Sequence, residues 1–165
     1  MSAEVPKAVK EWLDQADEDR RTTEILLADA EPPARSACFH SQQHVEKLLK
    51  GFLTSQGIEA PRTHDLSRLL QLAQPHLPEL GALAARADEL TRHAVETRYP
   101  PPLREVTVAE ARESFRIAQQ FAAVLVPKLR GGIADVPATR DAGAAEAAAD
   151  QGTCRPEDSP PQQER

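Results

Sequence analysis

Four polar side chains in the segment 34–55 have types and a spacing that could serve chemistry. His40, Gln43, Lys47 and Lys50 follow one another at intervals of three or four residues, so on a helix they form one polar face. Lysine offers a point charge to a phosphate, and the amide and the imidazole offer hydrogen bonds. Such a face is also commonly plain solvated surface. Both interpretations stay open at this point.

Other patterns that could carry chemistry are weaker. His40 and His44 have the i, i+4 spacing that can chelate a metal from one helix, but Glu46 points elsewhere on the helical wheel and no third ligand is apparent. The sequence holds no glycine-rich phosphate loop and no Gly-x-Ser-x-Gly elbow. We therefore expect no metal and no resident cofactor.

These side chains need helices to position them. The 14 prolines and 7 glycines fall mostly between segments with helical periodicity, and no segment alternates as a strand does. The periodicity predicts an all-α fold, an antiparallel bundle of four main helices plus one short helix. The expected helices cover roughly 5–29, 34–55, a short stretch after Thr63 that ends near Pro75, 79–97 and 107–130.

Caps and turns give the expected helix ends. Gly57 lies where the second helix needs a C-terminal cap, Thr63 and Thr107 are natural N-caps, and Gly131 is the expected stop of the last helix. The charged run 17–21 is expected to face solvent on the first helix.

Length and charge limit the remaining possibilities. The 165 residues suffice for one domain, expected over 1–130, while 131–165 are rich in Ala, Pro and acids and predict a disordered tail. The net charge of −6 argues against coating nucleic acid or an acidic membrane by bulk charge. Without a long apolar run or a secretory signal, we expect a soluble cytoplasmic protein without membrane contact.

At this point four ordered motifs resemble one family. The stretch 38–50 (CFHSQQHVEKLLK) looks like the signature helix of HEPN domains (higher eukaryote and prokaryote nucleotide-binding). Gly57 followed by the run 61–66 (PRTHDL), the pair Leu69-Leu70 and the run 97–100 (TRYP) agree with it in order. The resemblance spans roughly residues 8–129.

The resemblance implies a helical bundle, commonly dimeric, often encoded beside a minimal nucleotidyltransferase and grouped with toxin–antitoxin or nucleotide-handling systems. Arg98 would offer phosphate a planar fork and Tyr99 a ring for a base, although both could instead only lock a turn. Carried over to this sequence, the nucleotide-facing or partner-facing positions are His40, Gln43, Glu46, Lys47, Lys50, His64, Arg98 and Tyr99.

Some members of this family are ribonucleases with an Arg followed by a His on a late helix. Arg86 and His93 fit the loosest form of that pattern, about 10 Å apart along a helix axis. There His would act as general acid or base and Arg would stabilise the phosphorane charge. The His-x-Tyr extension of the nuclease toxins is missing, because Val95 stands at its last position.

The leading expectation is a HEPN-type domain that binds a nucleotide or a nucleotidyltransferase partner, is not catalytic on its own, and belongs to a toxin–antitoxin-like pair. We expect a homodimer formed through the second or the fifth helix. The first alternative is a metal-independent endoribonuclease toxin that uses Arg86 and His93 across a dimer to cleave RNA. The second is a protein-interaction scaffold.

Overall fold

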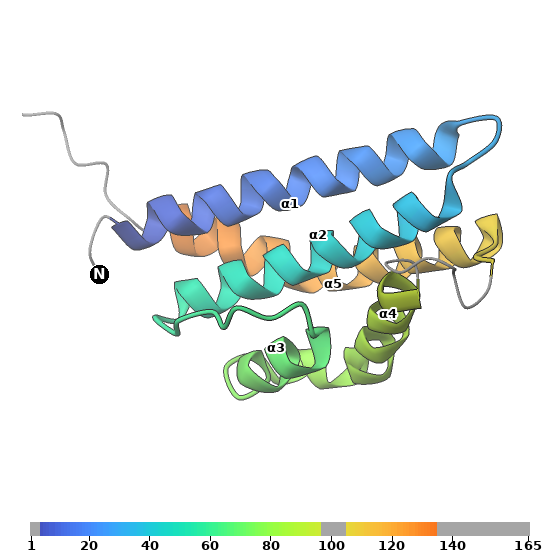
Figure 1. Ribbon diagram of the computed structural model, residues 1–165. Coiled ribbons are helices and arrows are strands. Elements are labelled where there is room, and N and C mark those ends of the chain that lie inside the picture. The colour runs from blue at the N-terminus through green and yellow to red at the C-terminus, as the bar shows by residue number, and fades with distance from the viewer. Residues whose placement is uncertain (1–3, 97–104, 135–165) are drawn as a thin grey trace, which may run out of the picture.

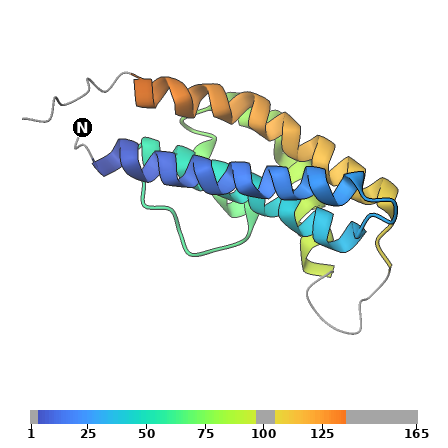
Figure 2. The ribbon, with the colours of Figure 1, turned by 90° about the horizontal axis from the view of Figure 1, so that it is seen from above.

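The structure, a computed structural model, describes residues 4–96 and 105–134, without the side chains of 93–96 and 132–134. Three long helices lie side by side: α1 (Glu4–Ala28), α2 (Ala34–Ser55) and α5 (Val108–Ala134). α1 runs antiparallel to α2, and α5 runs in the same direction as α2 (Figures 1 and 2). The segment between α2 and α5 forms α3 (Leu66–Ala73), the 3-10 helix η1 (Pro78–Leu83) and α4 (Ala84–Glu96).

α2 is the central helix of the bundle. It contacts α1, α5, α3 and α4, so its side chains are covered from several directions (Figure 1). The core is built on its apolar stripe and closed by α5 and α3. The largest fully buried apolar side chains are Leu48, Leu49, Leu53, Leu66, Leu69, Leu80, Leu90, Ile117, Phe121, Leu125 and Leu129. Because α2 is surrounded, polar residues on it are also drawn into the interior.

The all-helical fold with four main helices and one short helix is confirmed. α2 has the bounds that its periodicity predicts, and Gly57 ends it as expected with a φ of 72°. The Ile58 N–H donates to the Leu53 carbonyl at 2.9 Å and the Gly57 N–H to the Thr54 carbonyl at 3.0 Å. These two bonds form a Schellman motif, which satisfies carbonyls that a helix end leaves open. The expected disorder of 131–165 concerns residues that lie mostly outside the described part.

The first turn of α5 carries the expected cap. The Glu110 N–H donates to the Thr107 hydroxyl at 3.2 Å, and the Glu110 carboxylate accepts from the Thr107 N–H at 2.8 Å, which is a capping box. The expected stop at Gly131 is wrong, since α5 continues to Ala134. Glycine weakens a helix by only about 1 kcal/mol and does not break it.

Two other helix boundaries differ from expectation. Asp65, not Thr63, caps α3, because the Asp65 carboxylate accepts from the backbone N–H groups of Ser67 and Arg68. The Thr63 hydroxyl instead accepts from the Asp65 N–H at 3.1 Å, within the preceding turn. The segment expected as one helix over 79–97 is divided into η1 and α4.

The two glycines give a matched test of the backbone at helix ends. Gly57→Ala should lower the free energy of unfolding by about 1 kcal/mol, because a Cβ is strained at positive φ. Gly131→Ala should raise it by up to about 1 kcal/mol, because Gly131 is helical and a Cβ there meets no atom within 4 Å. Urea denaturation of both variants measures the difference, and equal effects would contradict this account of the α2 end.

Candidate functional site

Asp19 lies buried between α1 and α2, with only 6% of its surface exposed. Its Oδ1 lies 2.8 Å from Nδ1 of His40, and its Oδ2 accepts from Nζ of Lys47 at 2.5 Å. The expectation that 17–21 all face solvent is therefore wrong for this residue. Asp19 shares a face with the buried Ala16 and Thr23, at spacings of three and four residues, and this pattern is visible in the sequence.

Glu46 is the second buried carboxylate, with 3% of its surface exposed. It accepts from Nζ of Lys50 at 2.9 Å and from Nε2 of Gln42 at 3.1 Å, and it lies 3.0 Å from Nδ1 of His64. Nε2 of Gln43 reaches it more weakly, at 3.3 Å. Although the family pattern places Glu46 among positions that face a ligand, in this structure it holds the donors around it.

These residues form two hydrogen-bonded clusters, one around Asp19 and one around Glu46. The clusters are here together called the α2 polar face: Asp19, His40, Gln43, Glu46, Lys47, Lys50 and His64. The exposed fraction of the side chains rises from 11% at Lys50 through 22% at Lys47 and 30% at His40 to 61% at His64. His40, Lys47 and His64 are thus held by buried acids while part of each side chain reaches solvent, and Lys50 is buried. A plain solvated helix face would not have this arrangement.

α1 and α2 approach each other closely beside Lys50. A Cβ on Gly51 would meet Cβ of Trp12 at 3.0 Å, so the missing side chain lets the two helices approach there. Nζ of Lys50 lies 5.8 Å from the centre of the Trp12 ring, within the range of a cation–π interaction. Lys50 is therefore held by a carboxylate and faced by an aromatic ring.

His44 lies on α2 one turn from His40 but has a different environment. It is 3% exposed, and its Nδ1 lies 2.7 Å from the carbonyl oxygen of Ala16. Because a carbonyl only accepts, Nδ1 carries the proton and donates. Burial lowers the pKa of the His44 imidazole, which keeps the ring neutral. Nε2 of the ring is buried without a hydrogen-bond partner.

The i, i+4 spacing of His40 and His44 does not bring the two rings to one ligand, since each ring contacts a different partner on α1. Within 4–96 and 105–134, no three His, Cys, Asp or Glu side chains gather as a metal site would need.

The Arg86 guanidinium is engaged by two acids. Its Nη1 lies 3.0 Å from Glu89 and 3.5 Å from Glu113. The backbone of His93 belongs to α4, but its side chain lies outside the described residues, as do Arg98 and Tyr99 entirely. The structure thus tests neither the Arg86–His93 pair nor the Arg98–Tyr99 contribution to the site.

The chain was compared with known proteins. The family model for the HEPN domain matches residues 9–129, from the second turn of α1 to five residues before the end of α5. The chain belongs to the HEPN family. It is 28% identical over 134 residues to the "Putative toxin MJ1304" of Methanocaldococcus jannaschii. The aligned region covers 72% of this chain and 86% of the relative. No solved structure matches significantly.

In this HEPN domain the separate motifs of the sequence meet in space. Nε2 of Gln42 donates to the carbonyl oxygen of His64 at 3.0 Å, and the His64 ring reaches Glu46. The motif on α2 and the motif 61–66 therefore form one hydrogen-bonded unit, and Leu69 and Leu70 bury the next turn against the core. None of the helices described is long and apolar enough to span a membrane.

Removing a buried acid should cost more stability than removing an exposed one. Glu46→Ala should lower the free energy of unfolding by about 3 kcal/mol, because Lys50 would remain buried without its counter-charge. Asp14→Ala, which breaks the exposed pair with Lys10, should cost less than about 1 kcal/mol. Chemical denaturation of the two variants provides the comparison, and equal losses would show that Glu46 does not hold a buried charge.

His44 predicts a pH dependence of stability. As pH falls below the ordinary imidazole pKa of about 6.5, His44 binds a proton in the unfolded chain but not in the folded chain. The free energy of unfolding therefore decreases. The slope from this group is at most about 1.4 kcal/mol per pH unit.

His44→Phe should remove this part of the slope, while His76→Gln, a change at an exposed histidine, should keep it. Denaturation between pH 5 and pH 8, where histidines titrate, measures both. If the slope were unchanged in His44→Phe, the ring would not be buried in its neutral form.

Proposed function

We propose that this HEPN domain is the toxin-like component of a two-component system and that its α2 polar face binds the phosphate groups of a nucleotide. In this proposal it has no catalysis of its own. The observation that carries the proposal is the anchoring of partly exposed donors on two buried carboxylates, with His40 and Lys47 held by Asp19 and His64 held by Glu46.

Some hydrogen-bond donors of the α2 polar face are not used within the described part of the chain and are available to a ligand. The Lys47 ammonium has three donors and gives one to Asp19. His40 and His64 each use Nδ1 toward a buried acid, and a protonated imidazole offers a second N–H at Nε2. The acids fix where these donors lie, which lowers the entropy lost when an anion binds.

The energetic cost of burying Asp19 and Glu46 also supports a role beyond stability. Burying two carboxylates costs several kcal/mol each in desolvation, and pairing them recovers this only in part. Well-packed apolar residues at Asp19 and Glu46 would serve a purely structural purpose at least as well. We infer that the two buried acids serve to position the donors that reach solvent.

The relative with a toxin name supports a toxin-like role. A ribonuclease is less well supported, because the His-x-Tyr extension of the nuclease toxins is missing, with Val95 at its last position. The proposal includes a homodimer and a minimal nucleotidyltransferase as the partner chain, as members of the family commonly have. Co-expression with such a partner, followed by light scattering of the purified complex, would test both.

The direct test is thermal unfolding of the full chain against ribonucleoside mono-, di- and triphosphates, with and without magnesium. A nucleotide at 100 times its Kd adds about 2.7 kcal/mol and moves the midpoint by several degrees. Lys47→Gln, which keeps a donor near Asp19 but removes the charge, should weaken binding about tenfold. Charge reversal at Lys47 and Lys50 is unsuitable, since it would set carboxylates against buried carboxylates.

Lys128→Gln removes a charge from an exposed position of α5 and serves as the matched control, with no change expected. A panel without any shift, or an equal response of both variants, would contradict nucleotide binding at the α2 polar face. Capture of a nucleotidyltransferase by the same face would then become the function to test.

A further inference from the structure

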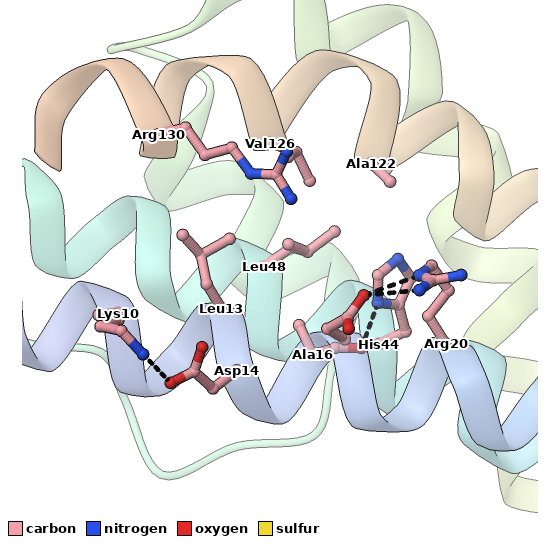
Figure 3. Close-up of a pocket in the computed structure, with 11 residues that line it drawn as sticks. Lys10, Leu13, Asp14, Ala16, Arg20, His44, Leu48, Ala122, Val126 and Arg130 are labelled. Atoms are coloured by element: carbon pink, nitrogen blue, oxygen red, sulfur yellow. Dashed lines mark hydrogen bonds and ion pairs between the residues drawn. The ribbon is translucent and has the colours of Figure 1, made fainter. Parts of the chain in front are cut away.

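A cleft of about 420 Å³ opens between α1 and α5, with α2 as its floor (Figure 3). Its volume lies within the range of small-molecule sites. Leu13, Leu48, Ala122 and Val126 give it apolar walls. Its charged lining residues are Lys10, Asp14, Asp17, Arg20 and Arg130.

His44 places a buried acceptor in this cleft. In Figure 3 one ring nitrogen faces the α1 backbone and the other lies toward α5. Because Nδ1 donates to the Ala16 carbonyl and the ring is neutral, Nε2 carries a lone pair and accepts. Nearly all buried polar atoms in native proteins have a partner, yet Nε2 has none in the described part of the chain. A ligand that donates an O–H or N–H would supply it.

Arg130 adds a positive charge at the mouth of the cleft that no residue in the described part of the chain pairs. Lys10 is paired with Asp14, and Arg20 with Asp17 and Glu24. No ion pair of Arg130 is present among the residues that the structure describes, and its side chain reaches over the cleft (Figure 3). An anionic group at this mouth would meet a guanidinium with its donors available.

We propose that this cleft binds a small amphipathic acid that donates a hydroxyl or N–H to Nε2 of His44, packs an apolar body between Leu13 and Val126, and pairs its carboxylate or phosphate with Arg130. This site is separate from the α2 polar face and does not depend on the proposed function.

Three probes of the full chain by calorimetric titration separate the contributions. Para-hydroxyphenylpropanoate carries the donor, the apolar body and the acid, phenylpropanoate lacks the donor, and para-ethylphenol lacks the acid. The complete probe should bind about tenfold more tightly than phenylpropanoate, since the hydroxyl satisfies a buried acceptor. Its affinity should exceed that of para-ethylphenol by about threefold or more, because its carboxylate pairs with Arg130.

Matched variants assign these differences to residues. In His44→Phe the hydroxyl should no longer improve binding, so the complete probe and phenylpropanoate bind alike. In Arg130→Gln the acid should no longer improve binding. Arg112→Gln, an exposed arginine of α5 outside the cleft lining, should change neither difference. Lys47→Gln should also leave them unchanged, which separates this site from the α2 polar face.

Two outcomes would overturn the proposal. One is the absence of saturable binding of para-hydroxyphenylpropanoate below about 10 mM, an affinity too weak for a built site. The other is a gain from the hydroxyl and from the acid that persists in the two variants. If His44→Phe fails to fold, the Arg130→Gln comparison still decides, because Arg130 is exposed.

Discussion

The structure depends on how α2 keeps charged residues while it is surrounded by other helices. A central helix in a bundle has little contact with solvent, and unpaired charges on it would cost several kcal/mol each. Asp19 and Glu46 solve this by placing one buried carboxylate on each side of the cationic residues of α2. The result is a face that is polar and hydrogen-bonded, with both of its lysines held by a buried acid.

The same pairing connects segments that are distant in the sequence. Asp19 ties α1 to α2 through His40 and Lys47, and Glu46 ties α2 to the turn before α3 through His64. The close approach at Gly51 and the Schellman motif at Gly57 fix the backbone on which these contacts depend. Packing and polar contacts therefore support one another.

Much of the fold was accessible from periodicity and caps, because these depend on local sequence. The apolar stripe of α2, the cap at Thr107 and the end at Gly57 are local features of this kind. The sequence alone does not decide the cap of α3, because Thr63 and Asp65 are both N-cap residue types and stand two residues apart.

The site was accessible only in part, because its anchors come from tertiary packing. The polar side chains of α2 follow from their spacing, but the burial of Asp19 and Glu46 requires knowing which helices cover which faces. Asp19 lies in a charged run that looks like surface, and only its register with Ala16 and Thr23 indicates otherwise. His44 has no sequence signal for its environment, since its partner is a backbone carbonyl on another helix.

The α2 polar face and the cleft meet in one turn of α1. Ala16 accepts from His44 in the cleft, Asp17 pairs with Arg20 on its rim, and Asp19 binds His40 and Lys47 on the polar face. A displacement of this turn along α2 would alter the contacts of both sites at once, because packed helices shift as units and not residue by residue. The two sites therefore use different side chains but rest on the same stretch of α1 backbone.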